Sequence, residues 1–350
     1  MAVGLSASTA RVRRVCFPFA GDSVGGSYFS ALLLMRELRA FSFEPLVVLH
    51  GEGPFADLLE RERIGYRILP LPALAGSSAR IADIAGAAIR SARPLRRFLR
   101  EQRIDLVHTN DLRMHLTWPL ATRLVGARFV CHQRIVLSRS PYWQILARAA
   151  HRIVCVSRAV FDTLPAAGRR RAAIIANPIA PPADLDRVSA HAALRRELGL
   201  TPQTKIVGYV GNMLRQKRPL VFLEAAAKVR AAVPGPLAFV MAGDNRGGEL
   251  DAVRRRAGEL GLAEQVHAIG FRTPIEPFIA GCDVLVAPGI ADGFGRTLAE
   301  AMVVGTPVVA SASGGHVELL ENGALGALVE PDDPAAFAGG VVRFLQHPDA

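Results

Sequence analysis

The sequence predicts an α/β protein of two doubly wound, Rossmann-like domains, and three observations support this fold class. Short apolar runs that resemble strands alternate with helical patterns along the whole chain. The alternation restarts after residues 178–186, which contain three prolines and no periodicity and which we interpret as a linker. The 350 residues are enough for two hydrophobic cores. The predicted domains therefore span residues 1–180 and 187–350.

The strand-like runs are short and apolar, which is typical of parallel strands with helices on both faces. In the first domain they read RVCFPFA, PLVVLH, IDLVHTN, ARFVCHQ, RIVCVS and AAIIANPI. In the second they read KIVGYVGN, LAFVMAGD, QVHAIGF, CDVLVAP and TPVVAS, with intervening helices predicted for example over 219–232 and 249–260. Ligands of such sheets bind beyond the carboxyl ends of the strands, so we expect the two domains to face a central cleft that holds the site.

Positive charge is concentrated in the first half of the chain. Residues 1–180 contain 26 Arg, no Lys and 12 acidic residues, a net charge of +14, whereas residues 181–350 contain 16 basic and 19 acidic residues, a net charge of −3. A codon preference explains why Arg outnumbers Lys 39 to 3, but not why the excess lies in one half. This asymmetry favours an anionic partner: a membrane surface, a phosphorylated acceptor or nucleic acid.

The helical pattern over 93–103 leaves two placements open. It sets Leu95, Phe98 and Leu99 on one side and arginines elsewhere. Such a helix could lie against acidic lipid headgroups. It could equally be an outer helix of the sheet with its apolar stripe turned inward.

Cysteine usage and hydropathy indicate a cytosolic protein. The four cysteines each lie inside an apolar strand-like run, far apart and without a C-x-x-C pair, which predicts buried free thiols; they are Cys16, Cys131, Cys155 and Cys282. No apolar run reaches the roughly 18 residues of a membrane span. The first residues, MAVGLSASTARVRR, lack an apolar signal core.

The stretch ADGFGRTLAEAMVVGTPVV is a glycine-rich loop that runs into a helix. Gly293 and Gly295 leave backbone amides open to a polar ligand. Glu300 lies about one turn into the helix, and its carboxylate can accept hydrogen bonds from two neighbouring hydroxyls such as those of a ribose. The alternative is that Glu300 only offsets the helix dipole.

Two further elements of the second domain have the features of phosphate sites. Gly314 and Gly315 open a helix after a strand, and a glycine-rich turn at a helix N-terminus suits an anion. In VGYVGNMLRQKRP, Lys217 and Arg218 precede a helix that Pro219 can start. A cation at this position can neutralise a diphosphate, above all as that group leaves with extra charge. The alternative is a solvated basic turn.

The first domain offers weaker signals. FAGDSVGGSYFS places Gly25 and Gly26 between a strand and a helix, although it does not match the G-x-G-x-x-G fingerprint. His108, Asn110 and His132 follow strands, where ligands of parallel sheets bind. Each of these residues alone is more often structural than catalytic.

Taken in order, these motifs resemble the retaining glycosyltransferases of family 4, which have the GT-B fold. The resemblance covers nearly the whole chain and is strongest from Lys205 to Pro331. It rests on four ordered blocks: VGYVGNMLRQKRPLVFLEAAA, FVMAGD, VHAIGF and the long block from CDVLVAP to LVEPDD. Four blocks in order are much more specific than any one of them.

The resemblance implies that the second domain binds a nucleotide-diphosphate sugar and the first domain the acceptor. It implies catalytic roles for Lys217, facing the diphosphate, and for Asp292, which orients the sugar or stabilises charge. The residues it assigns to the donor are Gly211, Asn212, Arg215, Arg218, Gly243, Phe271, Gly293, Phe294, Gly295, Glu300, Gly314 and Gly315. Those it assigns to the acceptor side of the cleft are Gly25, Gly26, His108 and Asn110.

Three departures from the family pattern stand out. The family pairs two glutamates with seven residues between them, and here Asp292 is the first of the pair, one methylene shorter. Asn212 replaces the usual arginine after the strand glycine. Arg215 or Arg218 could supply the positive charge that is lost. The chain ends at FLQHPDA, where family members usually continue into helices that cross back to the first domain.

The sequence thus predicts a retaining, metal-independent glycosyltransferase without a cofactor. The expected acceptor is a lipid-linked molecule or a saccharide, in the synthesis of a bacterial surface polysaccharide or lipopolysaccharide. We expect a cytoplasmic protein, peripheral on an acidic membrane through its basic first domain, that does not bind nucleic acid. Two alternatives remain: a non-catalytic sugar-nucleotide-binding protein, and a two-domain dehydrogenase, which the failed glycine fingerprint disfavours.

Overall fold

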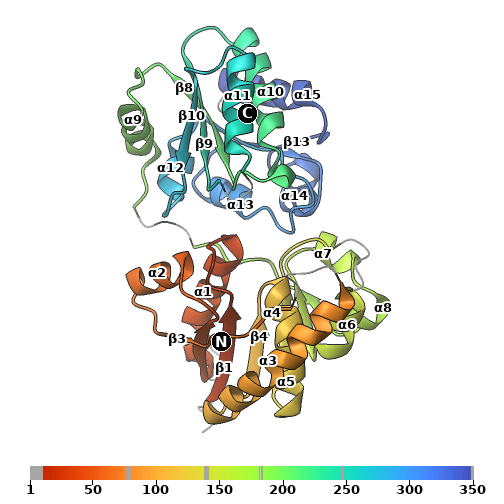
Figure 1. Ribbon diagram of the computed structural model, residues 1–350. Coiled ribbons are helices and arrows are strands. Elements are labelled where there is room, and N and C mark those ends of the chain that lie inside the picture. Colours follow the sequence, from red (N-terminus) through yellow and green to blue (C-terminus); the bar gives the residue numbers. More distant parts are fainter. Residues whose placement is uncertain are drawn as a thin grey trace, which may run out of the picture. The chain divides into compact units, whose positions relative to one another are not determined.

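The computed structural model describes residues 11–75, 80–137, 142–180, 182, 184–245 and 248–347 (Figure 1). It divides into two compact units, Met1–Pro178 and Ile179–Ala350. Each unit is a parallel sheet with helices on both faces, so the predicted doubly wound fold is confirmed for both. The N-terminal residues 1–10, the linker residues Pro181 and Ala183 and the final residues 348–350 lie outside the described part, and so do the expectations that concern them.

The first unit has seven parallel strands in the order β3-β2-β1-β4-β5-β6-β7. The strands are β1 (Arg13–Phe19), β2 (Phe43–Leu49), β3 (Tyr66–Ile68), β4 (Leu106–Thr109), β5 (Arg128–Gln133), β6 (Arg152–Cys155) and β7 (Ala172–Ile174). The strand order reverses direction between β1 and β4, the point at which such sheets bind ligands. The short β3, one of whose three residues is half-buried and two exposed, has no clear apolar run and escaped sequence detection.

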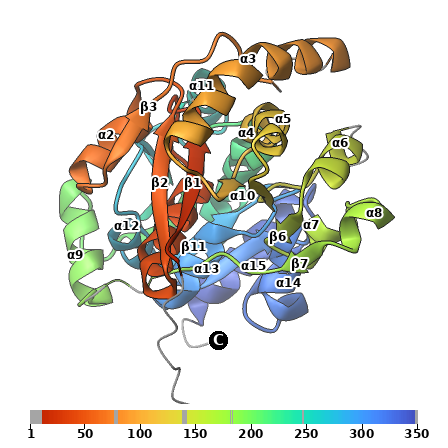
Figure 2. The ribbon, with the colours of Figure 1, turned by 90° about the horizontal axis from the view of Figure 1, so that it is seen from below.

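Helices cover both faces of this sheet. They are α1 (Gly26–Leu38), α2 (Pro54–Arg61), α3 (Ile81–Glu101), α4 (Leu112–Thr117), α5 (Pro119–Leu124), α6 (Tyr142–Ala149), α7 (Arg158–Asp162) and α8 (Ala166–Arg169). Figure 2 shows the long α3 beside α4 and α5, which it contacts. Leu95, Phe98 and Leu99 of α3 are buried. The lipid-facing placement of residues 93–103 is therefore wrong, because this apolar stripe already packs inside the unit.

The second unit has six parallel strands in the order β10-β9-β8-β11-β12-β13. They are β8 (Lys205–Val210), β9 (Leu237–Ala242), β10 (Val266–Gly270), β11 (Val284–Ala287), β12 (Val308–Ser311) and β13 (Ala327–Val329). The helices are α9 (Arg187–Glu197), α10 (Pro219–Ala232), α11 (Leu250–Glu259), α12 (Glu276–Ala280), α13 (Arg296–Val303), α14 (Gly315–Leu319) and α15 (Pro334–Gln346). In this unit the direction reverses between β8 and β11.

Two apolar clusters hold the helices of the second unit on opposite faces of its sheet. One joins Phe222 of α10 and Phe337 of α15 to Phe239 of β9. The other joins Leu194 of α9 and Leu298 of α13 to Ile206 of β8.

The cysteine prediction is confirmed. All four cysteines are buried and unpaired in disulfides. Burial raises the pKa of the Cys155 thiol to about 12, and it raises the pKa of Cys131 as well. These thiols therefore stay protonated and serve as core residues.

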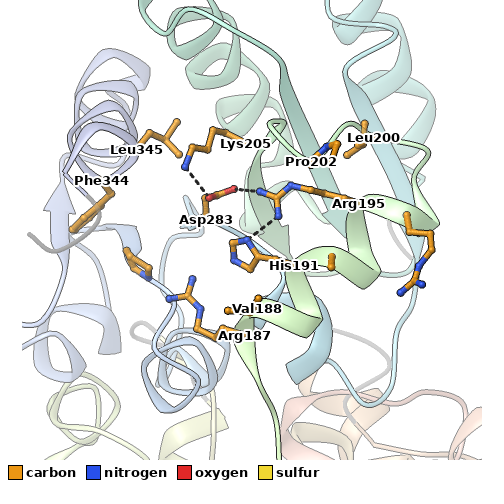
Figure 3. Close-up of a pocket in the computed structure, with 13 residues that line it drawn as sticks. Arg187, Val188, His191, Arg195, Leu200, Pro202, Lys205, Asp283, Phe344 and Leu345 are labelled. Atoms are coloured by element: carbon orange, nitrogen blue, oxygen red, sulfur yellow. Dashed lines mark hydrogen bonds and ion pairs between the residues drawn. The ribbon is translucent and has the colours of Figure 1, made fainter.

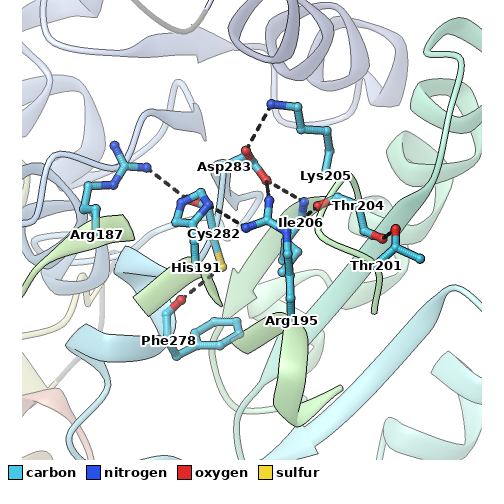
Figure 4. Close-up of polar contacts among 10 residues, drawn as sticks. All are labelled: Arg187, His191, Arg195, Thr201, Thr204, Lys205, Ile206, Phe278, Cys282 and Asp283. Atoms are coloured by element: carbon cyan, nitrogen blue, oxygen red, sulfur yellow. Dashed lines mark hydrogen bonds and ion pairs between the residues drawn. The ribbon is translucent and has the colours of Figure 1, made fainter. Parts of the chain in front are cut away.

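At the amino-terminal edge of the second sheet, α9 is tied down by a polar network (Figure 4). Asp283 accepts from the Ile206 amide at 2.7 Å and pairs with Arg195 and Lys205, both at 3.4 Å. Arg187 donates to the carbonyl of Cys282 at 3.1 Å. The side chains of Arg187, Arg195, Lys205 and Asp283 also line a cavity of about 760 Å³ (Figure 3). This cavity lies at the edge of the sheet where the strands begin, opposite to the edge where they end.

Candidate functional site

The candidate site of the second unit lies in the loops that follow β8, β11 and β12. These three strands are adjacent in the sheet, so the loops at their carboxyl ends meet. The backbone ties two of them directly, since the Ile290 amide donates to the Gln216 carbonyl at 3.0 Å. A second contact joins the loops after β11 and β12, since the Ala291 amide donates to Ser313 Oγ at 3.1 Å. The topology thus gathers segments that are about 100 residues apart in the sequence.

Lys217 and Asp292 form the central ion pair of this site. Lys217 lies in a single 3₁₀ turn (Arg215–Lys217), and its Nζ is 2.5 Å from Asp292 Oδ2. Burial alone would raise the pKa of Asp292, but the Lys217 ammonium, together with the nearby His316 ring, outweighs it and holds that pKa well below its ordinary value. Asp292 is therefore charged at all physiological pH values, and it neutralises Lys217 in the absence of another anion.

The Gly314–Gly315 turn packs directly on the loop that carries Asp292. A Cβ at Gly314, whose φ is +60°, would lie 2.3 Å from the Asp292 carbonyl oxygen, so only glycine fits. The Gly315 amide donates to the same carbonyl at 2.8 Å. The helix that follows, α14, has five residues and ends at Leu319. The Gly315 amide therefore already has a hydrogen-bond partner. At this residue the N-terminus of α14 offers no free amide to a phosphate.

Sequence reasoning missed His316. Its ring is 1% exposed, and Nε2 lies 3.6 Å from Asp292 Oδ2. On the other side of the ring, Nδ1 is 3.2 Å from Ser311 Oγ. A Cβ at Gly295 would lie 2.8 Å from His316 Cδ2, so the ring also supports the glycine loop. The one available signal was a histidine directly after a predicted phosphate turn.

Glu300 lies on α13, one turn after the loop, as expected. Its side chain is 6% exposed, and Oε1 pairs with Arg296 Nε at 2.7 Å. Burial raises the pKa of Glu300 to about 7, against the opposing effect of Arg296. A carboxylate in this position exchanges its proton near neutral pH. Its contact is with Arg296 on its own helix, and Lys217 contacts the other carboxylate, Asp292.

The basic residues around Lys217 differ in their availability. Arg218 pairs with Asp332 and donates to the Pro331 carbonyl at 2.6 Å. Its guanidinium therefore fixes the turn before α15, and the suggestion that it replaces the missing arginine charge is disfavoured. Arg215 is exposed, and among the described residues no group pairs with it. Asn212 accepts from the Asp244 amide at 3.2 Å, which makes it a loop-shaping residue.

In the second sheet, strands β8 and β9 are each followed directly by a glycine, Gly211 and Gly243. A Cβ at Gly243, whose φ is +154°, would lie 1.9 Å from the Gly211 carbonyl oxygen. A Cβ at Gly211 would lie 3.7 Å from Lys217 Cδ, so this glycine leaves the space beside Lys217 open. Phe271, at the end of β10, is 45% exposed. Gly295 has a φ of +86°, which starts α13 and turns the backbone around Phe294 at the strand end.

The first unit carries a buried polar cluster at the carboxyl ends of β4 and β5. His108 Nε2 lies 3.2 Å from His132 Nδ1, and the two rings stack with centroids 5.4 Å apart. Arg134 Nη2 donates to Asn110 Oδ1 at 2.8 Å and lies 3.3 Å from His132 Nδ1. Burial lowers the pKa of His108 to about 3, helped by Arg134, and it lowers the pKa of His132 as well. The cluster therefore combines neutral imidazoles with one buried guanidinium.

Arg134 is the residue of this cluster that sequence reasoning missed. It is 7% exposed, and it also donates to Asn177. His132 Nε2 is buried, and none of the described residues is its hydrogen-bond partner. A donor or acceptor brought by a ligand would satisfy it. The arginine follows β5 by one residue, which was the only sequence signal.

The glycine loop of the first unit lies between β1 and α1, as expected, and there is open space at Gly25. Gly25 precedes α1 with an extended backbone, and a Cβ there would meet nothing within 4 Å. Gly26 begins the helix. The close approach occurs instead at Gly21, whose φ is +96° and whose Cβ would lie 2.1 Å from the Gly51 carbonyl oxygen. Nearby, Arg113 forms a two-point ion pair with Asp22, with distances of 2.6 and 2.8 Å.

Two features are absent from the described residues. They contain no group of three or more His, Cys, Asp or Glu side chains arranged to hold a metal ion. They also contain no helix with the length and apolar character needed to span a membrane.

Comparison with protein families divides the chain as the fold does. Residues 24–181 match the family described as Glycosyltransferase Family 4. Residues 204–347 match the family described as Glycosyl transferases group 1.

Curated relatives are similar over part of their length. The D-inositol 3-phosphate glycosyltransferase of Corynebacterium jeikeium (strain K411) is 33% identical over 217 residues, which are 59% of this chain and 51% of the relative. The enzyme of the same name from Nocardia farcinica (strain IFM 10152) is 34% identical over 175 residues, 48% of this chain and 39% of the relative. The match thus spans about half, or less, of the length of these relatives.

Solved structures share the fold over nearly the whole chain. Anabaena Alr3699/HepE in complex with UDP and glucose superposes with a TM-score of 0.78 at 23% identity, covering 95% of this chain and 90% of that one. The lipopolysaccharide outer core galactosyltransferase WaaB superposes with a TM-score of 0.66 at 18% identity, covering 96% and 91%. At these identities the likeness concerns the fold.

Proposed function

Because the chain belongs to the GT-B glycosyltransferases, with a family 4 domain followed by a group 1 domain, we propose that it transfers a sugar from a nucleotide-diphosphate donor to a hydroxyl group with retention at the anomeric carbon. The observation that carries this proposal is the Lys217–Asp292 pair of the second unit, set between two glycine turns at the carboxyl ends of adjacent strands. Supporting it, the solved relative Alr3699/HepE holds UDP and glucose.

In this proposal Lys217 is the group that stabilises the leaving diphosphate. Its ammonium is one-third exposed and pairs with Asp292 alone among the described carboxylates. An incoming diphosphate would compete for the same ammonium, and Asp292 would then turn to the sugar hydroxyls. Stabilisation of the developing charge by a fixed cation is a large term in group transfer. Exposed Arg215 supplies a second cation, which compensates for Asn212. We therefore propose a reaction that requires no metal cofactor.

Glu300 is proposed to bind the ribose. As a carboxylate it accepts from both ribose hydroxyls, and the amides around Phe294 and Gly295 bind hydroxyls of the sugar. No side chain is assigned as a base, because in a front-face reaction the leaving phosphate takes the proton of the acceptor hydroxyl. The bond between the anomeric carbon and the phosphate oxygen breaks as the bond to the acceptor oxygen forms on the same face.

For the acceptor we propose a hydroxylic molecule that carries a negative charge. The curated relatives are named for D-inositol 3-phosphate, which has this character. In the first unit, Arg134 and the unsatisfied His132 Nε2 provide suitable donors for a phosphate. A lipid-linked saccharide phosphate at an acidic cytoplasmic membrane surface fits the same chemistry, as in polysaccharide or lipopolysaccharide synthesis.

A thermal-shift screen against UDP-, GDP- and ADP-sugars identifies the donor. The stabilising donor is then incubated with D-inositol 3-phosphate and with unphosphorylated inositol, and the anomeric configuration of the product is read by NMR. We expect stabilisation by one donor class that Glu300→Gln abolishes, whereas exposed Glu264→Gln retains it. The proposal fails if no sugar nucleotide stabilises the protein. Stabilisation without transfer to any acceptor supports the alternative, a non-catalytic sugar-nucleotide-binding protein.

A further inference from the structure

A second cavity, of about 780 Å³, opens in the first unit at the edge where its strands begin. It is surrounded by five arginines and a histidine, from the end of α5, the starts of β5 and β6, the end of α6 and the residue before β7. These residues are Arg123, Arg128, Arg148, His151, Arg152 and Arg171. Its position is opposite to that of His108 and His132, because parallel strands all begin at one edge and end at the other.

The positive charge of this cavity is not balanced by the protein. Among the described residues, no acidic residue lines it and no carboxylate pairs with any of the five arginines. Arg171 donates to the carbonyls of Ala147 and Ala150, at 3.3 and 3.1 Å, and Arg152 donates to the carbonyl of His151 at 3.2 Å. These contacts orient guanidinium groups without neutralising them.

The arginines of the cavity also affect its histidine, His151. Partial burial lowers the pKa of His151, and Arg128, Arg123, Arg171 and Arg152 lower it further. His151 Nδ1 accepts the Phe129 amide at 3.1 Å, so the neutral ring carries its proton on Nε2 and offers a donor. The cavity is thus lined by hydrogen-bond donors above an apolar floor that includes Leu106 and Val130.

The corresponding edge of the second sheet shows that arginine usage alone does not produce this arrangement. The cavity there is also basic, but Asp283 pairs with Arg195 and Lys205 (Figure 3). The first unit omits such a carboxylate and adds arginines. Like charges held together without a counter-charge repel, so their persistence favours an external anion.

We propose that the arginine-lined cavity of the first unit binds a ligand with two or more phosphate groups. The planar guanidinium group bonds phosphate oxygens in pairs, and the cavity volume is that of a small-molecule site. Five arginines from separate elements surround more space than one phosphate fills. The ligand comes either from a soluble polyphosphate compound or from a lipid headgroup with several phosphates, and both present the same chemistry to the arginines.

The test measures tripolyphosphate binding by titration calorimetry. Arg128→Gln/Arg152→Gln removes two exposed cavity arginines, and Arg93→Gln/Arg96→Gln removes the same charge from the exposed face of α3. We expect one tripolyphosphate per first unit, affinity at least about tenfold weaker in the cavity variant and within about twofold in the α3 variant. Lys217→Met, which alters the candidate donor site, should leave this binding in place.

Vesicles identify the source of the ligand. The same proteins are sedimented with phosphatidylcholine vesicles that contain either cardiolipin, with two phosphates, or phosphatidylserine at equal charge. Stronger binding to cardiolipin that the cavity variant loses indicates a lipid source, and tripolyphosphate binding without this preference indicates a soluble one. The proposal is overturned if wild-type protein binds neither probe, or if the cavity and α3 variants lose binding equally.

Discussion

At the carboxyl end of the second sheet the candidate site consists of charged pairs, whereas at that of the first sheet neutral histidines surround one buried arginine, beside the separate Arg113–Asp22 ion pair. In the second unit, Lys217 faces Asp292 and Arg296 faces Glu300. In the first unit, His108 and His132 lie against Arg134, whose described partners include Asn110 and Asn177. The same topological position thus supplies paired charges in one unit and unprotonated donors and acceptors in the other.

This difference teaches how each site is prepared for its ligand. A cation already paired with a carboxylate is held in place at little cost, and a ligand anion takes it over by exchange. A buried guanidinium beside neutral imidazoles gains most from a ligand that brings its own negative charge. Four predictions test this difference between the two units.

The largest effect is expected for Lys217→Met. Removing the cation leaves Asp292 without its partner and removes the charge that faces the leaving diphosphate. We expect kcat/KM for transfer to fall by about a thousandfold, in the range known for losing one charge-stabilising donor. Lys228→Met, on the exposed face of α10, is the matched control and should keep wild-type activity. Steady-state kinetics measures both, and a loss below about tenfold in Lys217→Met contradicts the assigned role.

Glu300→Gln should weaken donor binding by about tenfold to a hundredfold, because two charge-assisted hydrogen bonds become neutral. The raised pKa of Glu300, about 7, adds a pH dependence. The carboxylate form becomes populated as pH rises through 7, so donor affinity should increase between pH 6 and pH 8. Calorimetry with the donor identified above measures this slope, and Glu300→Gln should abolish it. An equal slope in wild-type and variant would show that another group titrates.

Acid should destabilise the first unit before the second. His115, on α4, is buried, with its Nδ1 2.6 Å from Thr109 Oγ1. The folded pKa values of His108 and His115 are lowered to about 3 by burial, so their contribution to stability is present above the unfolded value of 6.5 and is lost as pH falls toward 3. At pH 5 each histidine then costs roughly 2 kcal/mol. Glu300 acts in the opposite direction, since a raised carboxyl pKa favours folding below 4.5 and costs stability as pH rises through 7.

Hydrogen exchange read by mass spectrometry distinguishes the two units in one sample. Between pH 7 and pH 5, after correction for intrinsic exchange, peptides from β4 and β5 should lose protection while those from β8 and β11 keep it. His115→Gln, a conservative change at the Thr109 contact, should reduce the acid sensitivity. Equal loss of protection in both units would contradict the contrast drawn between their sites.

The smallest effect is expected for Arg134→Gln. The KM for a phosphorylated acceptor should rise about tenfold, because one charge-assisted contact is lost, while the KM for the sugar donor stays within about twofold. Arg134→Lys keeps the charge but loses the two-point geometry and should recover part of the effect. Comparison of D-inositol 3-phosphate with unphosphorylated inositol supplies the control. An equal rise for both acceptors would show that Arg134 only maintains the fold of the cluster.

Much of this molecule was decided by local sequence. Apolar runs of strand length, separated by helical periodicity, determined two parallel sheets with helices on both faces, because only that arrangement buries them. Glycine turns after strands marked the loops of the second unit, and the helix over 219–232 begins and ends as predicted. Of the three-residue edge strands, β7 was predicted from its apolar run AAIIANPI, whereas β3 and β13 lie in segments without such a run and were missed.

Only the tertiary structure decided which charges meet. Lys217 and Asp292 are 75 residues apart and pair because β8 and β11 are neighbours in the sheet. Arg218 was equally plausible as a donor-binding cation until its pairing with Asp332 appeared. His316 and Arg134 carry no motif of their own, and their importance comes from burial. The sequence states which side chains follow strands, and the order of the strands determines which of them share a site.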